Sequence, residues 1–269
     1  SSDLATPLSG YETHSKGSAL AFAFPSLEAA VSFAVVMQRA LLEMALPDDL
    51  AGHAAFGEKL GERGQVLFKG LPVKVGISYG VPVMRRPVRA TGRANYHGNV
   101  VQQGARTMLA ACPGQVLLAG ADAVAQLGVP LEALEATLVD KKQEAVMVSS
   151  KVLVDVGCPE LHIRALGYFK QEGESGNLPL LDVVPPELSE RAFSLPPGRV
   201  GAAAAASVPT ERGSSEVSRG RTERRVGEAS LATIMSNILD ERVTRKPAGS
   251  EEKVQVCGIL GQGMQGKVM

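Results

Sequence analysis

Apolar and polar positions follow two different periods in the first part of the chain. Residues 17–24 (GSALAFAF) form a short apolar run that is opened by a glycine and closed by Pro25, which predicts a buried strand. From Ser26 onward, apolar residues recur every three or four positions, whereas Arg39 and Glu43 fall off that face. This spacing predicts an amphipathic helix, and Ser26 is a suitable N-cap because its hydroxyl accepts a backbone N–H.

Further elements are predicted by the same two periods. Residues 47–65, with several glycines and mixed charge, are predicted to form a loop. The remaining pattern predicts strands over residues 71–83, 115–119, 151–156, 161–169 and 180–184, and helices over residues 99–111 and 121–127. Strands and helices alternate, which predicts an α+β or α/β sandwich.

The composition changes after Pro196. The following segment contains an alanine tract, glycine, serine and charged residues but few large apolar ones, so it cannot bury enough surface to offset the entropy of ordering. We therefore expect a domain over residues 1–196 and a flexible linker over residues 197–250, with a short amphipathic helix near 230–242. A new strand is predicted within residues 251–269, at 253–260.

Charge and cysteine content narrow the function classes. The 28 basic residues balance the 28 acidic ones, and no basic run is interleaved with aromatics, so binding to nucleic acid is not expected. The three cysteines lie far apart and form no metal-ligand pattern, which favours an intracellular, cytoplasmic location. No apolar run reaches the length of a membrane span. The first residue is Ser1 and the last is Met269, and we expect an excerpt of a longer protein.

The most specific pattern is the segment 92–106 (GRANYHGNVVQQGAR), which follows VKVGISYG and precedes CPGQVLLAG. It resembles the signature segment of the class III nucleotidyl (adenylate or guanylate) cyclase catalytic domain. Residues 11–41 and the stretch that starts at Leu166 are similar to other parts of that domain. The resemblance covers residues 10–193 and implies a ferredoxin-like α/β sandwich that lacks its N-terminal part.

The resemblance also implies a reaction. Such domains catalyse attack of the ribose 3′-hydroxyl of a nucleoside triphosphate on its α-phosphate, helped by metal ions that two aspartates hold. The first aspartate would precede Ser1, and the position of the second is occupied by Ser18. A serine cannot replace an anionic ligand of a hard cation, so Mg²⁺ or Mn²⁺ is expected only if a partner subunit supplies the aspartates.

Four positions correspond to nucleotide contacts of the family. By resemblance, His14 and Asn95 occupy the base-reading positions, Gln102 the ribose-orienting position and Arg106 the catalytic position that faces a phosphate. Only Arg106 keeps the usual residue, and its guanidinium can hold a phosphate from a fixed fork. The resemblance therefore implies a degenerate site and leaves the choice between ATP and GTP open.

The family works as dimers with sites at the interface, which implies that this chain forms a homodimer or a heterodimer with another cyclase domain. We favour a regulatory, dimerising role without turnover, because His14, Asn95 and Gln102 all differ from the pattern. The alternative is an active half that completes a partner's site: by resemblance, the metal position also reads Gly-Ser in the second half of paired cyclases, so Ser18 with Arg106 is compatible with this role. A third possibility is a non-catalytic scaffold.

A glycine motif follows the strand predicted near the C-terminus. Gly261, Gly263, Gly266 and Val268 form a GxGxxGxV pattern. It resembles the phosphate loop of protein kinases, whose glycines let backbone N–H groups approach the phosphates of ATP. We expect a kinase domain to begin within residues 251–269 and the parent to be an intracellular signalling protein; a chance glycine turn is the alternative.

Overall fold

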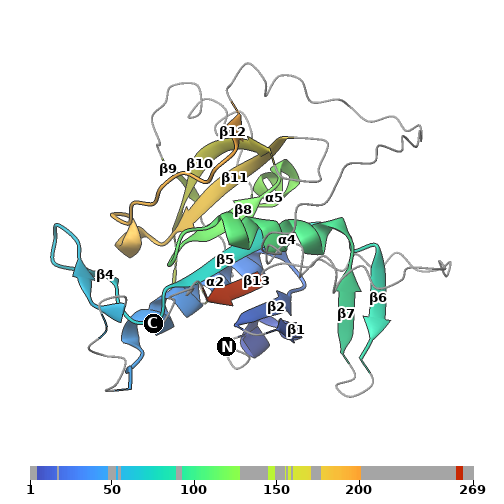
Figure 1. Ribbon diagram of the computed structural model, residues 1–269, viewed down its shortest axis with the longest axis horizontal. Coiled ribbons are helices and arrows are strands. Elements are labelled where there is room, and N and C mark those ends of the chain that lie inside the picture. The colour runs from blue at the N-terminus through green and yellow to red at the C-terminus, as the bar shows by residue number, and fades with distance from the viewer. Residues whose placement is uncertain are drawn as a thin grey trace, which may run out of the picture.

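The computed structural model describes most of the chain before residue 201 and a short segment near its C-terminus (Figure 1). The described residues are 5–16, 18–47, 53, 56–88, 93–127, 145–148, 155, 157–158, 160–170, 177–200 and 259–262. The predicted helix near 230–242 and most of the predicted linker lie outside them.

The described part is built on one mixed sheet. Its strands are β1 (Tyr11–Lys16), β2 (Ala19–Ala23), β5 (Val73–Ser78), β8 (Val116–Ala119), β9 (Ala145–Val148), β10 (Leu161–Lys170), β11 (Asn177–Val184), β12 (Arg199–Val200) and β13 (Ile259–Gln262). The strand order is β1-β2-β13-β5-β8-β11-β10-β12, with β9 also paired to β10. Strands β5 and β8 are parallel, and the other pairs are antiparallel.

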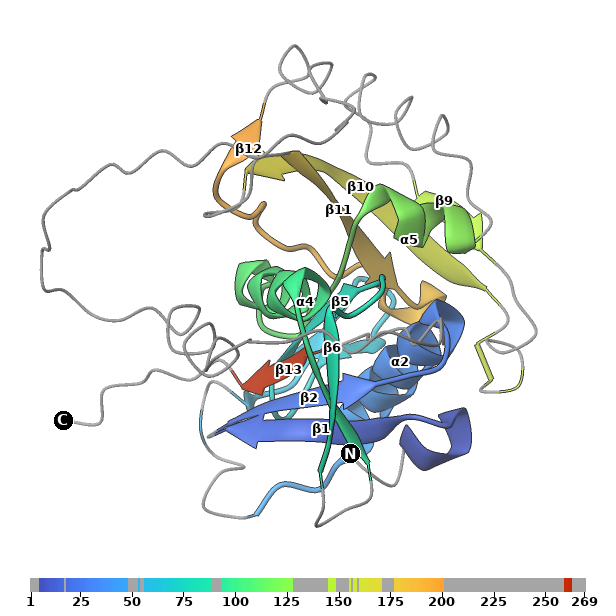
Figure 2. The same ribbon diagram turned by 90° about the vertical axis from the view of Figure 1, so that its right-hand side faces the viewer.

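Helices lie on both faces of this sheet. The long helices are α2 (Leu27–Glu43) and α4 (Asn99–Ala110), and the shorter ones are η1 (Thr6–Leu8), α5 (Ala121–Gln126) and η3 (Pro186–Leu188). On β2, Phe22 belongs to the apolar core that contains α2, whereas Ala23 belongs to the cluster that contains α4. Figure 2 shows the two helices on either side of β5.

Two hairpins extend from the body. Hairpin β3–β4 (Lys59–Leu60 and Val66–Phe68) and hairpin β6–β7 (Met84–Pro87 and Ala94–His97) each form a separate two-stranded sheet. Figure 1 shows them at opposite ends of the molecule. The main sheet and its helices therefore lie between the two hairpins.

Several predictions from the sequence are confirmed. A mixed α/β fold is present, and α2 begins after Ser26, whose Oγ accepts a hydrogen bond from the nitrogen of Ala29 at 3.2 Å. The predicted strand over residues 17–24 corresponds to β2, and the predicted helix over residues 99–111 corresponds to α4. The finer description as a ferredoxin-like sandwich stays a prediction.

Other predictions were wrong in detail. The strand predicted over residues 71–83 ends at Ser78, because the chain leaves the sheet and enters β6. The loop predicted over residues 47–65 contains β3, which pairs with β4. In the strand predicted over residues 151–156, Asp155 alone is described, and it is helical.

Two segments beyond residue 196 also differ from the expectation. Arg199 and Val200, assigned to the linker, pair with Phe169 and Tyr168 of β10. The strand predicted over residues 253–260 is described as β13, which extends through Gln262 and lies between β2 and β5. Both segments therefore belong to the main sheet.

The contact between α4 and β5 depends on Gly76. A methyl group at Gly76 would lie 2.1 Å from the backbone nitrogen of Met108 and 2.5 Å from the backbone oxygen of Gly104. Such distances are shorter than any real carbon contact, so α4 lies directly against the backbone of β5. Nearby, the hydroxyl of Ser78 donates a hydrogen bond of 2.6 Å to the oxygen of Val100.

We expect Gly76→Ala to lower the free energy of unfolding by at least about 2 kcal/mol, because the added methyl group must push α4 off the sheet. Gly80→Ala is the matched control, since its methyl group would meet Val100 Cγ2 at an ordinary 3.4 Å. Urea denaturation of the 269-residue chain measures both. Equal stabilities of the two variants would contradict this account of the contact.

Candidate functional site

His14 lies on β1 opposite Ala21 of β2. The register shifts between Glu12 and His14, and within this bulge the hydroxyl of Thr13 donates to the oxygen of Ala21 at 3.2 Å. Residues directly opposite each other in an antiparallel pair share a face of the sheet, so His14 is on the same face as Ala21. The side chain is half-buried, and its Nε2 atom is buried without a hydrogen-bond partner in the described part of the structure.

Asn95 lies on β7, in the hairpin that projects from the body. Its Oδ1 accepts a hydrogen bond of 3.0 Å from the nitrogen of the next residue, Tyr96. Tyr96 is buried, and its hydroxyl accepts a hydrogen bond of 2.8 Å from the hydroxyl of Tyr11 on β1. Because side chains alternate along a strand, Asn95 points to the other face of the hairpin from Tyr96.

Gln102 and Arg106 both lie on α4. They are four residues apart, so they lie one turn apart on one side of the helix, and both are half-buried. The helix begins after Gly98, whose φ of 127° favours glycine, and a methyl group there would lie 2.8 Å from the nitrogen of Val83. Gly98 thus brings the start of α4 against the segment that leads into β6.

The structure brings the elements that carry these four predicted residues to one apolar cluster beside α4. Ala21 and Tyr11 pack against the same apolar cluster as Tyr96 and the α4 residues Val101 and Ala105. The elements that carry His14, Asn95, Gln102 and Arg106 therefore meet at this cluster, although Asn95 points away from it. We call these four residues the α4-face site.

Ser18 lies in the turn between β1 and β2 and is exposed. It is placed at the position where the family resemblance expects a metal-binding aspartate. Among the described residues, no group of three or more His, Cys, Asp or Glu side chains could hold a metal ion. A hydroxyl is not an anionic ligand, so Ser18 itself does not fit an Mg²⁺ or Mn²⁺ site, and supply of carboxylates by a partner stays a prediction.

The glycine motif is described only at its start. Gly261 is extended within β13 and pairs with Lys74 on one side and Ala19 on the other. The sequence predicts that Gly261 lies in a loop that follows the strand. That prediction was wrong, because Gly261 lies within the strand. Gly263, Gly266 and Val268 lie outside the described residues.

A buried polar network that sequence reasoning missed lies around the turn that precedes β8. The guanidinium of Arg191 donates to the oxygens of Leu67 at 2.7 Å, Gly114 at 2.8 Å and the Gln38 side chain at 2.8 Å. It also stacks over the Phe68 ring, 4.7 Å from its centre. Burial lowers the pKa of Arg191 to about 10, which still leaves it charged at neutral pH.

Asp182 of β11 belongs to the same region. One of its oxygens accepts a hydrogen bond of 3.3 Å from Gln115, and the other lies 3.7 Å from the guanidinium of Arg164. Burial raises the pKa of Asp182 to about 6, because the cost of removing a carboxylate from water exceeds the attraction of these partners. No sequence pattern marks Asp182 or Arg191, since Asp182 is a single charge in an apolar strand and Arg191 lies in a short polar segment next to Glu190.

The sequence is similar to those of adenylate cyclases. Over 121 residues it is 33% identical to an adenylate cyclase of Mycosarcoma maydis, and over 166 residues it is 29% identical to one of Schizosaccharomyces pombe. These matches cover 45% and 61% of this chain but 5% and 9% of the relatives. The chain therefore contains a cyclase-like domain and spans less than a tenth of the length of these relatives.

A third relative has a different name. Over 110 residues, 40% of this chain and 6% of the relative, the sequence is 30% identical to a protein of Acanthamoeba polyphaga mimivirus that is named as a putative serine/threonine-protein kinase/receptor. No family model matches the chain.

Two solved structures also resemble this one. They are adenylate cyclases from Trypanosoma brucei in their monomeric state, with TM-scores of 0.47 and 0.46 and identities of 22% and 18%. The alignments cover 72% of this chain and 77% and 79% of those chains. In the described part of this chain, no helix has the length and apolar character needed to cross a lipid bilayer.

The raised pKa of Asp182 predicts a pH dependence of stability. Between about pH 4 and pH 6 the folded state keeps a proton that the unfolded state releases, so this residue makes stability fall as pH rises through that window. A difference of about two pKa units corresponds to roughly 3 kcal/mol. In Asp182→Asn this decline is expected to disappear.

The wild-type chain, Asp182→Asn and the control Asp155→Asn are compared by urea denaturation at pH 4, 5, 6 and 7. Asp155 is a suitable control because it is exposed. The control is expected to follow the wild type. Parallel curves for the wild type and Asp182→Asn would show that the carboxyl is solvated.

Proposed function

We propose that this chain holds a class III cyclase-like domain with a degenerate site, which has a regulatory and dimerising role in an intracellular signalling protein. The observation that carries the proposal is the exposed serine at position 18, where the family resemblance expects an aspartate, in a chain that is similar to adenylate cyclases. A hydroxyl at that position cannot neutralise the charge of a divalent cation. The chain alone is therefore expected to bind or position a partner rather than turn over a nucleotide.

The proposed dimer uses the α4-face site. Near the start of α4, two neighbouring apolar side chains, Val81 and Val83, are 69% and 75% exposed. These valines precede hairpin β6–β7, whose strand β7 carries Asn95. We propose that this face packs on a second copy or on another cyclase domain, which would cover the valines.

A second candidate function is a contributing half. Arg106 and Gln102 lie one turn apart on α4, so a phosphate and a ribose of one nucleotide could contact the same helix. A partner subunit that bears both metal aspartates would then supply Mg²⁺ or Mn²⁺ and the attacking geometry. In this alternative, Arg106 binds phosphate charge in the transition state.

We also propose that the parent protein carries a protein kinase after this domain. The support is the spacing of Gly261, Gly263, Gly266 and Val268, together with the kinase/receptor name of the mimivirus relative. Glycines at that spacing let backbone N–H groups surround the phosphates of ATP. Sequencing the parent gene beyond Met269 tests this proposal, because a lysine on the next strand and a catalytic-loop aspartate must follow.

The first functional prediction is that the 269-residue chain alone produces no cyclic nucleotide from ATP or GTP with Mg²⁺ or Mn²⁺. The missing carboxylate removes several kcal/mol of transition-state stabilisation, on the order of 3 or more. Product is measured by chromatography, and sedimentation in the same buffer reports association. Robust Mn²⁺-dependent turnover by the purified chain would sink the degenerate-site proposal.

The second functional prediction separates the regulatory dimer from the contributing half. In a co-purified pair with a cyclase domain that bears both aspartates, Arg106→Ala is expected to leave turnover unchanged, because the regulatory role needs no phosphate contact. Arg63→Ala is the control, since the Arg63 side chain is 89% exposed on hairpin β3–β4.

The opposite result would favour the contributing half. Turnover would then fall by roughly two orders of magnitude in Arg106→Ala with the pair still assembled, because the loss falls on the transition state. Arg106→Lys would restore it poorly, since an ammonium cannot reproduce the guanidinium fork.

A further inference from the structure

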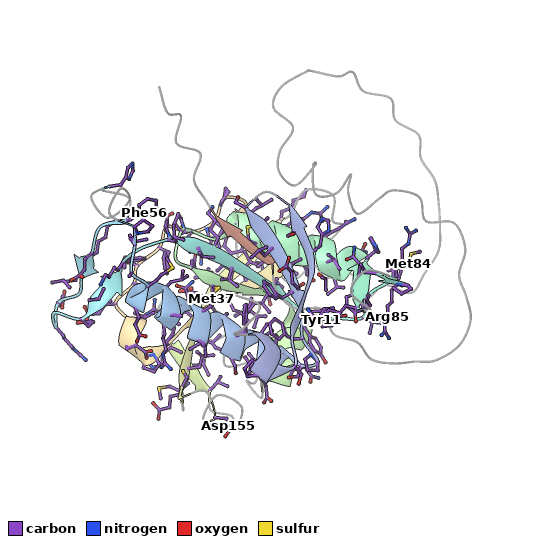
Figure 3. All side chains as sticks on the ribbon, turned by 90° about the horizontal axis from the view of Figure 1, so that it is seen from below. Tyr11, Met37, Phe56, Met84, Arg85 and Asp155 are labelled. Atoms are coloured by element: carbon purple, nitrogen blue, oxygen red, sulfur yellow. The ribbon has the colours of Figure 1, made fainter. Side chains whose placement is uncertain are left out.

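A cavity lies at the end of the molecule opposite the α4-face site. Its volume is about 440 Å³, within the range of small-molecule pockets. It is bounded by hairpin β3–β4, the last turn of α2 and the turns that precede β5 and β8. In Figure 3, Phe56, next to the lining residue Gly57, marks this end, and Met84 and Arg85 of β6 mark the other.

The charged residues that line the cavity are all cations. They are Lys59, Lys69 and Arg191, and no aspartate or glutamate belongs to its described lining. Lys69 has a carboxylate partner outside the lining, Glu58, whose Oε2 lies 4.0 Å from the Nζ of Lys69. Both side chains of that pair are nearly half exposed, so water screens it and Lys69 keeps most of its attraction for an anion.

The rest of the wall is mainly apolar. Leu41 and Leu42 come from α2, Leu71 precedes β5, and two aromatic rings, Phe68 and Phe193, also line the cavity. The two rings contact each other edge to face, with centres 6.0 Å apart. A bare inorganic anion would leave these apolar surfaces in contact with water, whereas a ligand with a hydrocarbon body would cover them.

From this combination we propose that the cavity binds a small organic anion: a carboxylate on an aromatic or branched aliphatic body. The carboxylate lies toward Lys59 and Lys69, and the body lies against Leu41, Leu71 and Phe68. This binding does not depend on the proposed function of the α4-face site, because the two sites share no residue.

The cavity is connected to α4 through the turn that ends the helix. Pro113 and Gly114 line the cavity, and Arg191 donates to the oxygen of Gly114 at 2.8 Å. Gly114 has a φ of 83° and precedes β8 by two residues. A ligand in contact with this turn would stabilise its conformation, and the turn follows directly after the helix that carries Gln102 and Arg106.

The test compares three ligands of one shape. Calorimetry with the full chain measures binding of phenylacetate, its neutral amide phenylacetamide and its cationic counterpart phenethylamine, with inorganic phosphate as a fourth probe. We expect phenylacetate to bind on the order of tenfold more tightly than phenylacetamide, and phenethylamine and phosphate to bind more weakly still.

Two variants locate the binding. Lys59→Gln and Lys69→Gln are each expected to weaken phenylacetate binding by roughly fivefold while leaving phenylacetamide binding unchanged. Lys170→Gln is the matched control, because Lys170 is exposed on β10 and does not line the cavity. The lysines are exposed, so these variants fold even if changes at the buried Arg191 do not.

Three results with phenylacetate would overturn the proposal, and one with phosphate. The first three are absence of phenylacetate binding at millimolar concentration, equal binding of the acid and the amide, and equal affinity of the two cavity variants and the wild type. Tighter binding of phosphate than of phenylacetate would also overturn it, because that result would mean a lysine surface without an apolar pocket.

Discussion

The close approach of α4 to β5 is the constraint on which the functional part of this structure depends. At Gly76 the helix backbone occupies the space of a missing side chain, and Ser78 fixes the same helix through the oxygen of Val100. A helix held against a strand by backbone contact cannot slide or rotate without breaking that fit. The position of Gln102 and Arg106 relative to the sheet therefore follows from two small residues on the strand below them, Gly76 and Ser78.

At the opposite end of the sheet, rigidity comes from a buried cation instead of a missing side chain. Arg191 is held by oxygens of Leu67, Gly114 and Gln38, which lie on three different segments. Burying the charge costs free energy, and the hydrogen bonds offset that cost only while all three segments stay in place. One side chain thus joins hairpin β3–β4, helix α2 and the turn before β8, and it also defines the wall of the cavity.

The parts of the fold that the sequence predicts are those with dense or periodic apolar residues. Helix α2 is buried at every position from Ala29 to Val35, and strand β2 is buried at both Phe22 and Ala23, so each needs an apolar run that is readable without knowledge of a partner. Strand β1, with the sequence YETHSK, is mostly polar and is stabilised by pairing with β2, which no local pattern reveals. The short hairpins and the pairing of Arg199–Val200 depend likewise on distant partners, so periodicity cannot find them.

For the candidate site, too, one part could be predicted from the sequence and another part only from the structure. The sequence predicts which residues correspond to nucleotide contacts, and the structure brings their elements to one cluster around Tyr96 and α4. The residues that fix the backbone there, Gly76 and Gly98, are required by steric contacts, whereas the Nε2 atom of His14 is buried without a hydrogen-bond partner in the described part of the structure. A fold constrained by packing can keep its shape while such polar positions change, so similarity to adenylate cyclases carries over to the scaffold more securely than to the chemistry.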